Sequence, residues 1–261
     1  MTAADINPQQ PLVEFRSVTY AINGSRKIID NLSLDVHRGE TVVLLGESGC
    51  GKTTTLRLVN RLLTPTAGEV LVEGQSTTEW DAIRLRRRTG YVIQEAGLFP
   101  HFTVAENVAL VPSLESWEHD RIKQRTRELL DLVGLDSAQF ADRYPRELSG
   151  GQRQRVGVAR ALAADPPLLL MDEPFGALDP LTRASLQKEF AELKERLGKT
   201  VIFVTHDVRE ALLLGSHIGL MHKGELLQLE TPEEFRRSKN ELALAYLETL
   251  KLSEDGAEVR G

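Results

Sequence analysis

The sequence has little cysteine, no long apolar run and no excess of basic residues, and each of these absences excludes a class of protein. Its 261 residues include a single cysteine, Cys50, which excludes an internal disulfide and is typical of a reducing compartment. No apolar run approaches the roughly 20 residues that span a bilayer. Lysine and arginine number 32 against 38 acidic residues, and the net charge of −6 argues against a nucleic-acid partner, because proteins that neutralise phosphates usually carry a basic excess.

The N-terminal segment MTAADINPQQP has neither the basic region nor the apolar run of a signal peptide. Hydrophobic residues make up 41% of the chain and charged residues 27%, which are ordinary globular values, and the length allows one large domain or two lobes. We therefore expect a soluble, cytoplasmic protein, for which any role at a membrane needs a partner.

Apolar runs of strand length alternate with helix-like stretches, a pattern that predicts an α/β fold with a parallel sheet. Between Leu98 and Ala164 the pattern turns helical and predicts an inserted lobe. The expected strands are Leu12–Phe15, Ile28–Val36, Thr41–Leu45, Val70–Val72, Tyr91–Ile93, Leu168–Met171, Val201–Thr205, Ile218–Met221 and Leu226–Leu229. The expected helices include Lys52–Leu63, Arg121–Val133, Leu181–Leu197 and Val208–Leu214.

The strongest local signal is the segment GESGCGKT, residues 46–53, which follows an apolar strand and opens a helix. Its glycines let backbone N–H groups approach phosphate oxygens. Lys52 can reach the outer phosphates of a nucleotide, and the Thr53 hydroxyl can bind Mg²⁺. The residues expected to contact the nucleotide are Gly46, Glu47, Ser48, Gly49, Cys50, Gly51, Lys52, Thr53 and Thr54.

Two carboxylates, Asp172 and Glu173, end the apolar strand Leu168–Met171. In an open α/β sheet, ligands bind beyond the carboxyl ends of the strands, so these side chains are expected near the phosphate site. Asp172 would bind Mg²⁺ through water, and Glu173 would act as general base toward the attacking water. A protein that only binds nucleotide has no need of the second carboxylate, so hydrolysis is predicted.

Two further polar residues follow predicted strands at the same edge. His206 comes directly after Val201–Thr205 and is expected to contact the γ-phosphate. Gln94 comes after Tyr91–Ile93, just before the helical lobe, and is a candidate contact to Mg²⁺ or water and a candidate hinge. A histidine or glutamine after a strand is more often structural or solvated, and the neighbouring phosphate site is what favours a functional role here.

A second anion cradle is predicted in ELSGGQRQRVGVARALAAD, where Ser149 precedes Gly150, Gly151 and Gln152 at the start of a helix. A small polar N-cap, unhindered N–H groups and the positive end of the helix dipole would favour an anion. This cradle has no lysine, and the chain already carries a complete phosphate loop. A well-capped structural helix would explain Ser149 but not the glycine pair.

Six ordered motifs resemble the nucleotide-binding subunit of ABC transporters, over roughly Leu12 to Phe235. The resemblance implies an α/β fold: a P-loop NTPase (RecA-like) core with an antiparallel β subdomain and an inserted α-helical subdomain. It implies an ABC ATPase domain at residues 12–235, with the core at 12–94 and 165–235 and the helical subdomain at 95–164, before a C-terminal helix and polar tail at 236–261. The motifs are the phosphate loop, the Q-loop Gln94, the signature Leu148–Gln152, the Walker B residues Asp172 and Glu173, the D-loop ending at Asp179, and the switch His206.

Proteins of this family pair head to tail, so the resemblance implies a homodimer with two ATP molecules and Mg²⁺ at the interface. The Ser149 cradle would then close over the γ-phosphate bound by the other subunit, which explains why it has no lysine. Asp179 is expected at the same nucleotide. In this family an aromatic residue near the first strands stacks on the adenine; Tyr20 is the candidate, although the usual position falls nearer Ile22.

The segment from Tyr91 through Val104 to Pro112 resembles the ATPases of glycine betaine, choline and carnitine uptake systems. This implies a peripheral subunit at the cytoplasmic face of the inner membrane, working with a separate permease and indirectly with a periplasmic or extracellular substrate-binding protein. Leu98, Phe99 and Phe102 could contact the permease or pack within the lobe. Regulatory modules of the kind that follow the cassette in some relatives are not expected before Gly261, so osmotic gating is expected elsewhere.

Two kinds of alternative remain open: another transported solute, and an ABC ATPase that does not serve transport. The solute could be an amino acid or a polyamine. A translation-associated ABC ATPase usually carries two cassettes, a DNA-repair ATPase carries inserted coiled coils, and a non-hydrolysing regulatory binder would lack Glu173 or His206. The chain has one cassette, no coiled-coil insertion and both residues, which favours a transport ATPase.

Overall fold

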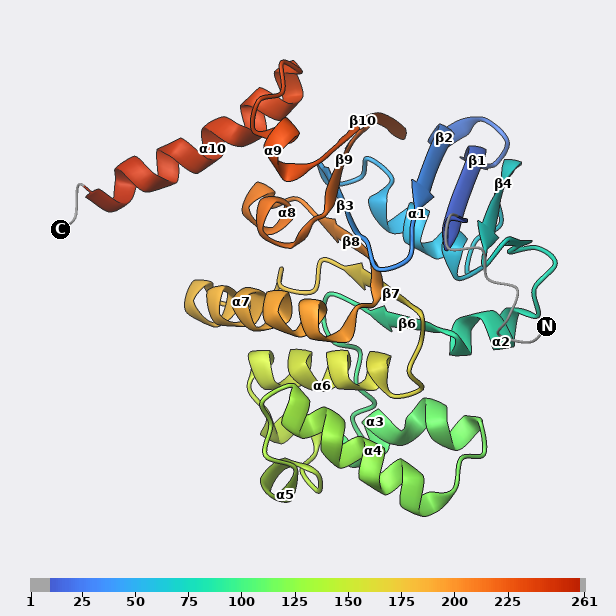
Figure 1. Ribbon diagram of the computed structural model, residues 1–261, viewed down its shortest axis with the longest axis vertical. Coiled ribbons are helices and arrows are strands. Elements are labelled where there is room, and N and C mark those ends of the chain that lie inside the picture. Colours follow the sequence, from blue (N-terminus) through green and yellow to red (C-terminus); the bar gives the residue numbers. More distant parts are fainter. Residues whose placement is uncertain (1–9, 259–261) are drawn as a thin grey trace. The chain divides into compact units, whose positions relative to one another are not determined.

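The computed structural model describes residues 10–258, with side chains up to Leu250 (Figure 1). The chain forms two compact units. The first unit contains the residues up to Glu79 and those from Ile202 onward, and the second unit is Trp80–Val201. None of the described helices is long and apolar enough to cross a membrane.

An antiparallel sheet in the first unit has the order β2-β1-β4-β5. Its strands are β1 (Val13–Ile22), β2 (Arg26–Val36), β4 (Ala67–Val72) and β5 (Gln75–Ser76). Buried and exposed residues alternate along the second half of β2, as expected for a strand with one face on a core. A turn at residues 23–25 joins β1 to β2, with Asn23 and Gly24 at positive φ.

A second group of strands runs in the order β10-β9-β3-β8 and belongs to the first unit except for Thr200 and Val201, the first two residues of β8. All six residues of β3 (Thr41–Gly46) and of β8 (Thr200–Thr205) are buried, as the apolar runs predict for strands covered on both faces. β3 pairs in parallel with β9 (His217–His222). β10 (Glu225–Glu230) instead pairs antiparallel with β9, because the two-residue connection at Lys223 and Gly224 allows only a hairpin.

Four helices belong to the first unit in the described part of the chain: α1 (Lys52–Val59), α8 (Val208–Leu214), α9 (Pro232–Phe235) and α10 (Glu241–Glu258). The prediction that the first of these reaches Leu63 is wrong. The helix is capped by Asn60, and Arg61 takes a left-handed φ of 53°, which ends the helical hydrogen-bonding pattern. The end of the predicted C-terminal tail, residues 259–261, lies outside the described residues.

In the second unit, β6 (Thr89–Val92) and β7 (Leu168–Asp172) pair in parallel, with Tyr91 opposite Leu170. The buried core beside them includes Val108, Leu130 and Val156. The helices are α2 (Ala82–Arg87), α3 (Val104–Leu114), α4 (His119–Leu132), α5 (Ser137–Phe140), the 3₁₀ turn η1 (Pro145–Glu147), α6 (Gly150–Leu162) and α7 (Pro180–Leu197).

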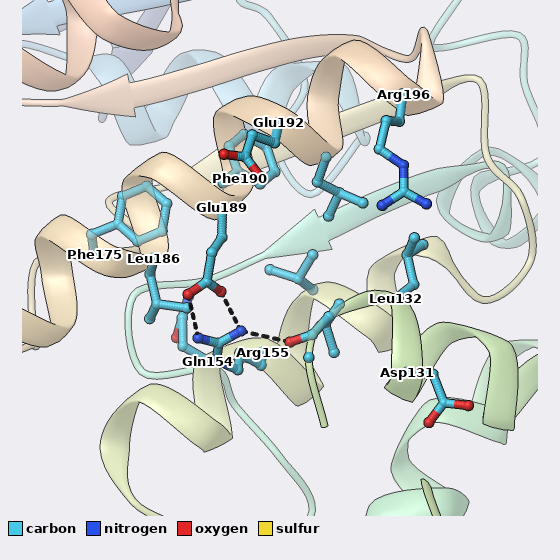
Figure 2. A pocket seen from close by; sticks show the side chains of 14 residues that line it. Asp131, Leu132, Gln154, Arg155, Phe175, Leu186, Glu189, Phe190, Glu192 and Arg196 are labelled. Carbon is cyan, nitrogen blue, oxygen red and sulfur yellow. Dashed lines mark hydrogen bonds and ion pairs between the residues drawn. The ribbon is translucent and has the colours of Figure 1, made fainter. Parts of the chain in front are cut away.

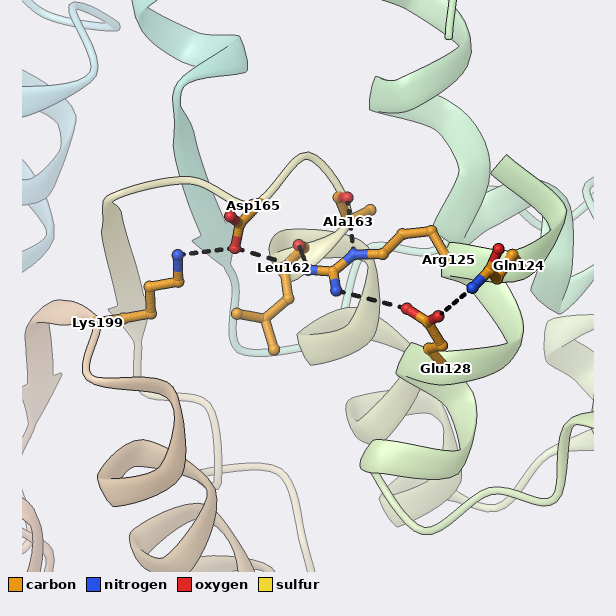
Figure 3. Close-up of polar contacts among 7 residues, drawn as sticks. All are labelled: Gln124, Arg125, Glu128, Leu162, Ala163, Asp165 and Lys199. Carbon is orange, nitrogen blue, oxygen red and sulfur yellow. Dashed lines mark hydrogen bonds and ion pairs between the residues drawn. The ribbon is translucent and has the colours of Figure 1, made fainter. Parts of the chain in front are cut away.

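A polar network joins α4 to the chain that follows α6 (Figure 3). Arg125 donates to the carbonyl of Leu162 at 3.2 Å and lies 3.7 Å from the Asp165 carboxylate. Lys199 donates to the same carboxylate at 2.8 Å, and this hydrogen bond is the main reason why the pKa of Asp165 is below its ordinary value. The network fixes the loop that leads from α6 into β7.

Candidate nucleotide site

The predicted phosphate loop connects β3 to α1 in the first unit. Gly51 has φ 110°, and a Cβ there would lie 2.5 Å from Ile29 Cδ1 and 2.8 Å from the carbonyl oxygen of Ile28. Only glycine fits this conformation and this space. The side chain of Lys52 turns back into the loop, where Nζ donates to the carbonyls of Gly46 at 2.7 Å and Glu47 at 2.9 Å.

Lys52 is only 4% exposed, so its charge is held inside the loop rather than in solvent. Cys50 is also buried, with its Sγ 4.0 Å from Lys52 Nζ. Burial raises the pKa of the Cys50 thiol, and the neighbouring Lys52 charge opposes this only in part. The thiol is therefore neutral and unreactive at physiological pH.

Tyr246 of α10 is a neighbour of this loop that the sequence analysis missed. Its pKa is raised to about 12, mainly because the hydroxyl is partly buried and further because Cys50 and Glu47 disfavour its ionisation. The apolar stripe of α10 predicts a packed helix face, but no sequence pattern indicates which part of the fold that face meets.

The other predicted residues of the first unit lie at the ends of β8 and β1. His206 is exposed directly after β8, which neighbours β3. The turn that carries His206 is fixed by Thr205, whose hydroxyl donates to the buried Glu210 at 2.5 Å and accepts from the N–H of Asp207 at 2.9 Å. Tyr20 is half-buried on β1, whereas Ile22 is 45% exposed.

In the second unit, Asp172, Glu173 and Gln94 gather at the carboxyl ends of β6 and β7. Asp172 accepts a hydrogen bond of 3.2 Å from the hydroxyl of Tyr91, a partner that the sequence analysis did not identify. Glu173 has a φ of 46°, a sparsely populated conformation that is typical of functional turns. The exposed Gln94 lies against Gly176, where a Cβ would be 3.2 Å from its Nε2.

The predicted second cradle is the exposed N-terminus of α6. Ser149 caps the helix, as expected: its Oγ accepts from the N–H of Gln152 at 3.2 Å, and the Gln152 Oε1 accepts from the N–H of Ser149 at 2.8 Å. Gly150 is exposed and Gly151 is buried. Arg153, which the sequence analysis did not single out, adds a positive charge in this first turn and donates to the carbonyl of Leu148 at 2.6 Å.

Asp179 caps the next helix, α7, by accepting from the N–H of Thr182 at 3.1 Å. Hydrogen bonds from Thr182 keep the pKa of Asp179 below its ordinary value, so the carboxylate is ionised at neutral pH. Arg183 holds the preceding turn by donating to the carbonyls of Phe175, Gly176 and Leu178. The Asp179 segment is thus a fixed, charged turn.

A separate cavity of about 360 Å³ lies between α4, α6 and α7 (Figure 2). Its walls combine apolar side chains, among them Val158, Leu186 and Leu193, with the ion pair between Arg155 and Glu189. None of the residues predicted from the sequence to bind nucleotide or metal lines this cavity. The predicted chemistry therefore belongs to the two sets of residues at the strand and helix ends, one set in each unit.

Comparison with known proteins settles the family. The model of the ABC transporter family matches residues 29–176, a span that includes the phosphate loop, Gln94, the Ser149 turn and both strand-end carboxylates. The chain belongs to the ABC transporter family. Both the predicted family and the predicted α/β P-loop fold are thereby confirmed.

Among relatives of known name, the chain is 49% identical over 227 residues to the glycine betaine/carnitine/choline transport ATP-binding protein OpuCA of Bacillus subtilis (strain 168), covering 87% of this chain and 60% of OpuCA. It is 50% identical over 221 residues to the glycine betaine uptake system ATP-binding protein YehX of Escherichia coli (strain K12), covering 85% of this chain and 71% of YehX. The chain thus spans only part of the length of these ABC proteins.

A solved ABC cassette has the same fold. The dimeric, post-hydrolysis structure of the ATP-binding cassette MJ0796 bound to ADP and Pi matches with a TM-score of 0.74 and 36% sequence identity, covering 84% of this chain and 98% of MJ0796. In that protein the cassette is a dimer with the products of ATP hydrolysis bound.

Proposed function

We propose that this protein is the ATP-hydrolysing subunit of an importer for quaternary ammonium osmoprotectants such as glycine betaine, choline and carnitine, and that it drives a separate permease. The observation that carries the ATPase part is the buried Lys52 held between two carbonyls of the phosphate loop. The solute class is supported by the names of relatives that are about half identical to this chain.

In this proposal Lys52 exchanges the carbonyls of Gly46 and Glu47 for outer phosphate oxygens of ATP, while the N–H groups of residues 46–54 surround the phosphates. Glu173, set in its left-handed turn, takes a proton from the water that attacks the γ-phosphate. His206 donates a hydrogen bond to the γ-phosphate. Tyr20 remains the candidate for stacking on the adenine.

The donor set fits Mg²⁺, which favours oxygen ligands and is usually held by one or two protein groups together with substrate phosphates and water. Thr53 offers a hydroxyl, Gln94 an amide oxygen and Asp172 a carboxylate oriented by Tyr91. The described residues include no group of three or more His, Cys, Asp or Glu side chains that could hold a metal by themselves. When bound, Mg²⁺ would neutralise charge on the phosphates.

The Ser149 cradle acts on the nucleotide of a second copy in this proposal. Its N-terminus is exposed, its cap is satisfied within the helix, and the free N–H groups with the Arg153 charge favour an anion brought from outside. Asp179 and its fixed turn belong to the same surface. The structurally similar MJ0796 cassette, which is a dimer with ADP and Pi, supports this arrangement.

The rest of the proposal concerns organisation. Residues 12–94 and 165–235 form the nucleotide-binding core in function, and residues 95–164 form the helical subdomain that passes motion to the permease. The subunit lies at the cytoplasmic face of the membrane and works indirectly with a substrate-binding protein outside it.

The test is uptake of labelled glycine betaine and choline in a strain that lacks this subunit and the redundant transporters, with and without osmotic upshift. The wild-type gene should restore uptake, and Glu173→Gln should not, although the variant protein is made at the same level. Restored uptake of an amino acid or a polyamine alone would reject the solute class and keep the ATPase. Wild-type uptake with Glu173→Gln would reject the role of Glu173.

A further inference from the structure

Arg160 makes two short hydrogen bonds from the third turn of α6 to the segment that follows β6. Its Nη1 donates to the carbonyl of Gly97 at 2.7 Å, and its Nη2 donates to the carbonyl of Ala96 at 2.6 Å. Burial lowers the pKa of Arg160 from its ordinary, very high value, but a guanidinium stays charged at any physiological pH. These are therefore two charge-assisted bonds formed by one planar group.

The acceptors lie in an unusual turn. Ala96 and Gly97 have φ values of 58° and 54°, so two consecutive residues are left-handed, and Ala96 is 1% exposed. A left-handed, buried alanine costs energy that the surroundings have to supply. Within the turn, the N–H of Ala96 donates to the carbonyl of Ile93 at 3.0 Å and the N–H of Gly97 donates to the carbonyl of Glu95 at 2.6 Å, and the carbonyls of Ala96 and Gly97 accept from Arg160.

The same face of α6 packs closely on this turn. A Cβ at Gly157 would lie 3.2 Å from the Cβ of Ala96, tighter than most such contacts, so glycine is what lets the helix approach. One turn earlier, the buried Gln154 reaches the carbonyl of Ile93 at 3.5 Å. Residues spaced three apart on one helix face, Gln154, Gly157 and Arg160, thus all face the 93–97 turn.

From these contacts we propose that Arg160 is a positioning residue: it holds the 93–97 turn on α6, so that Gln94 and the Ser149 cradle at the start of the same helix move as one body. This rests on the proposed function, in which Gln94 contacts Mg²⁺ or the attacking water and Ser149 contacts the nucleotide of a second copy. Gln94 also lies against Gly176, whose N–H donates to the carbonyl of Glu173 at 3.1 Å.

Arg160 therefore makes two short polar contacts between α6 and the turn that carries Gln94. Lysine cannot replace it, because an ammonium does not present two donors in the fixed fork that reaches both carbonyls. A matched control exists on the same helix. Arg155 also binds a main-chain carbonyl, that of Val133 at 2.7 Å, and the carboxylate of Glu189, but it faces α4 and α7 (Figure 2).

The test compares Arg160→Met, Arg160→Lys and Arg155→Met in ATPase assays over a range of Mg²⁺ concentrations. Both Arg160 variants should lose kcat, about ten-fold for methionine and less for lysine, and should need several-fold more Mg²⁺ for half-maximal rate, as expected when a residue that orients a metal ligand is removed. Arg155→Met should keep the wild-type Mg²⁺ dependence. In a Gln94→Ala background, Arg160→Met should cause no further loss, since it acts through Gln94.

A second measurement does not depend on catalysis. Hydrogen exchange of the amides of residues 95–98, without nucleotide, should be faster in both Arg160 variants than in the wild type and unchanged in Arg155→Met. Unchanged exchange, or an Mg²⁺ dependence equal to that of Arg155→Met, would overturn the role of Arg160. A wild-type protein without ATPase activity would reject the proposed function instead, while the exchange data would still decide whether Arg160 holds the turn.

Discussion

The phosphate loop and the Ser149 cradle are both glycine-rich helix N-termini, yet they are built in opposite ways. The loop is interior: Lys52 is buried and hydrogen-bonded, and Gly51 has no room for a side chain. The cradle is exterior: Ser149 and Gly150 are exposed, and the cap is completed by Gln152 of the same helix. In the proposed function, this difference means that the loop holds the nucleotide of its own subunit, whereas the cradle offers N–H groups to the nucleotide of a second copy.

The largest expected effect comes from removing the interior cation. Lys52→Ala should reduce ATPase activity at least about 100-fold, because the outer phosphates lose the one lysine of the phosphate loop. The check is steady-state hydrolysis with circular dichroism to show that the variant is folded. Full turnover by a folded variant would contradict the assignment of Lys52.

A substitution in the exposed Ser149 cradle should abolish ATPase activity, and pairing with a second, differently substituted copy should restore part of it. Ser149→Arg fills the cradle with a bulky side chain and should inactivate the protein on its own. Heterodimers of Ser149→Arg with Lys52→Ala should regain part of the activity, because one of the two interfaces then combines an intact lysine with an intact serine. We would measure activity against the mixing ratio. If mixing gave no activity while wild-type protein showed concentration-dependent turnover, action across an interface would be ruled out.

The sequence predicts the local features of the phosphate loop and of the Ser149 cradle, but not the long-range contacts around them. The glycine pattern and the Ser149 cap follow from local rules, and both were predicted. The contacts of Arg160 with Ala96 and of Tyr91 with Asp172 join residues 64 and 81 positions apart, and no local pattern carries them. The end of α1 was misjudged because apolar residues continue past Val59, while the left-handed Arg61, which ends the helix, leaves no mark in composition.

Alanine substitutions of Gly51 in the phosphate loop and Gly150 in the cradle should differ in their effect on the free energy of unfolding. Gly51→Ala should destabilise the fold by about 2 kcal/mol or more, since φ 110° and the contact with Ile29 are both incompatible with a Cβ. A Cβ at Gly150 would meet Leu178 Cδ2 at 3.5 Å and Arg153 Nη2 at 3.9 Å, both ordinary contacts, so Gly150→Ala should leave stability unchanged or raise it by up to about 1 kcal/mol. Urea denaturation measures both free energies.

ATPase assays of Gly150→Ala then show what the exposed glycine is for. Activity lost from a fully stable protein would mean that the glycine serves an incoming group rather than the helix. Equal destabilisation by the two substitutions would contradict the distinction between an interior loop and an exterior cradle.

A smaller effect is expected on how the free energy of unfolding depends on pH, because the Cys50 thiol is buried in the phosphate loop. Burial raises its pKa above the ordinary value of 9.0, so the folded protein keeps the thiol proton to higher pH than the unfolded chain does. The resulting stability is complete below the unfolded pKa and is lost as pH rises through the folded pKa. Wild-type protein should therefore lose stability relative to Cys50→Ala above about pH 9, by at most about 1.4 kcal/mol per pH unit because one proton is involved.

The measurement is the free energy of unfolding of both proteins at pH 7.5 and pH 10. Alkaline groups that do not interact with Cys50 affect both proteins alike and cancel in the difference. What remains is the thiol with Lys52 and Glu47 beside it, together with Tyr246, whose ionisation Cys50 disfavours. A difference between the two proteins that stays constant with pH would mean that the Cys50 thiol ionises as readily in the fold as in water. The phosphate loop would then be more open to solvent than its buried lysine indicates.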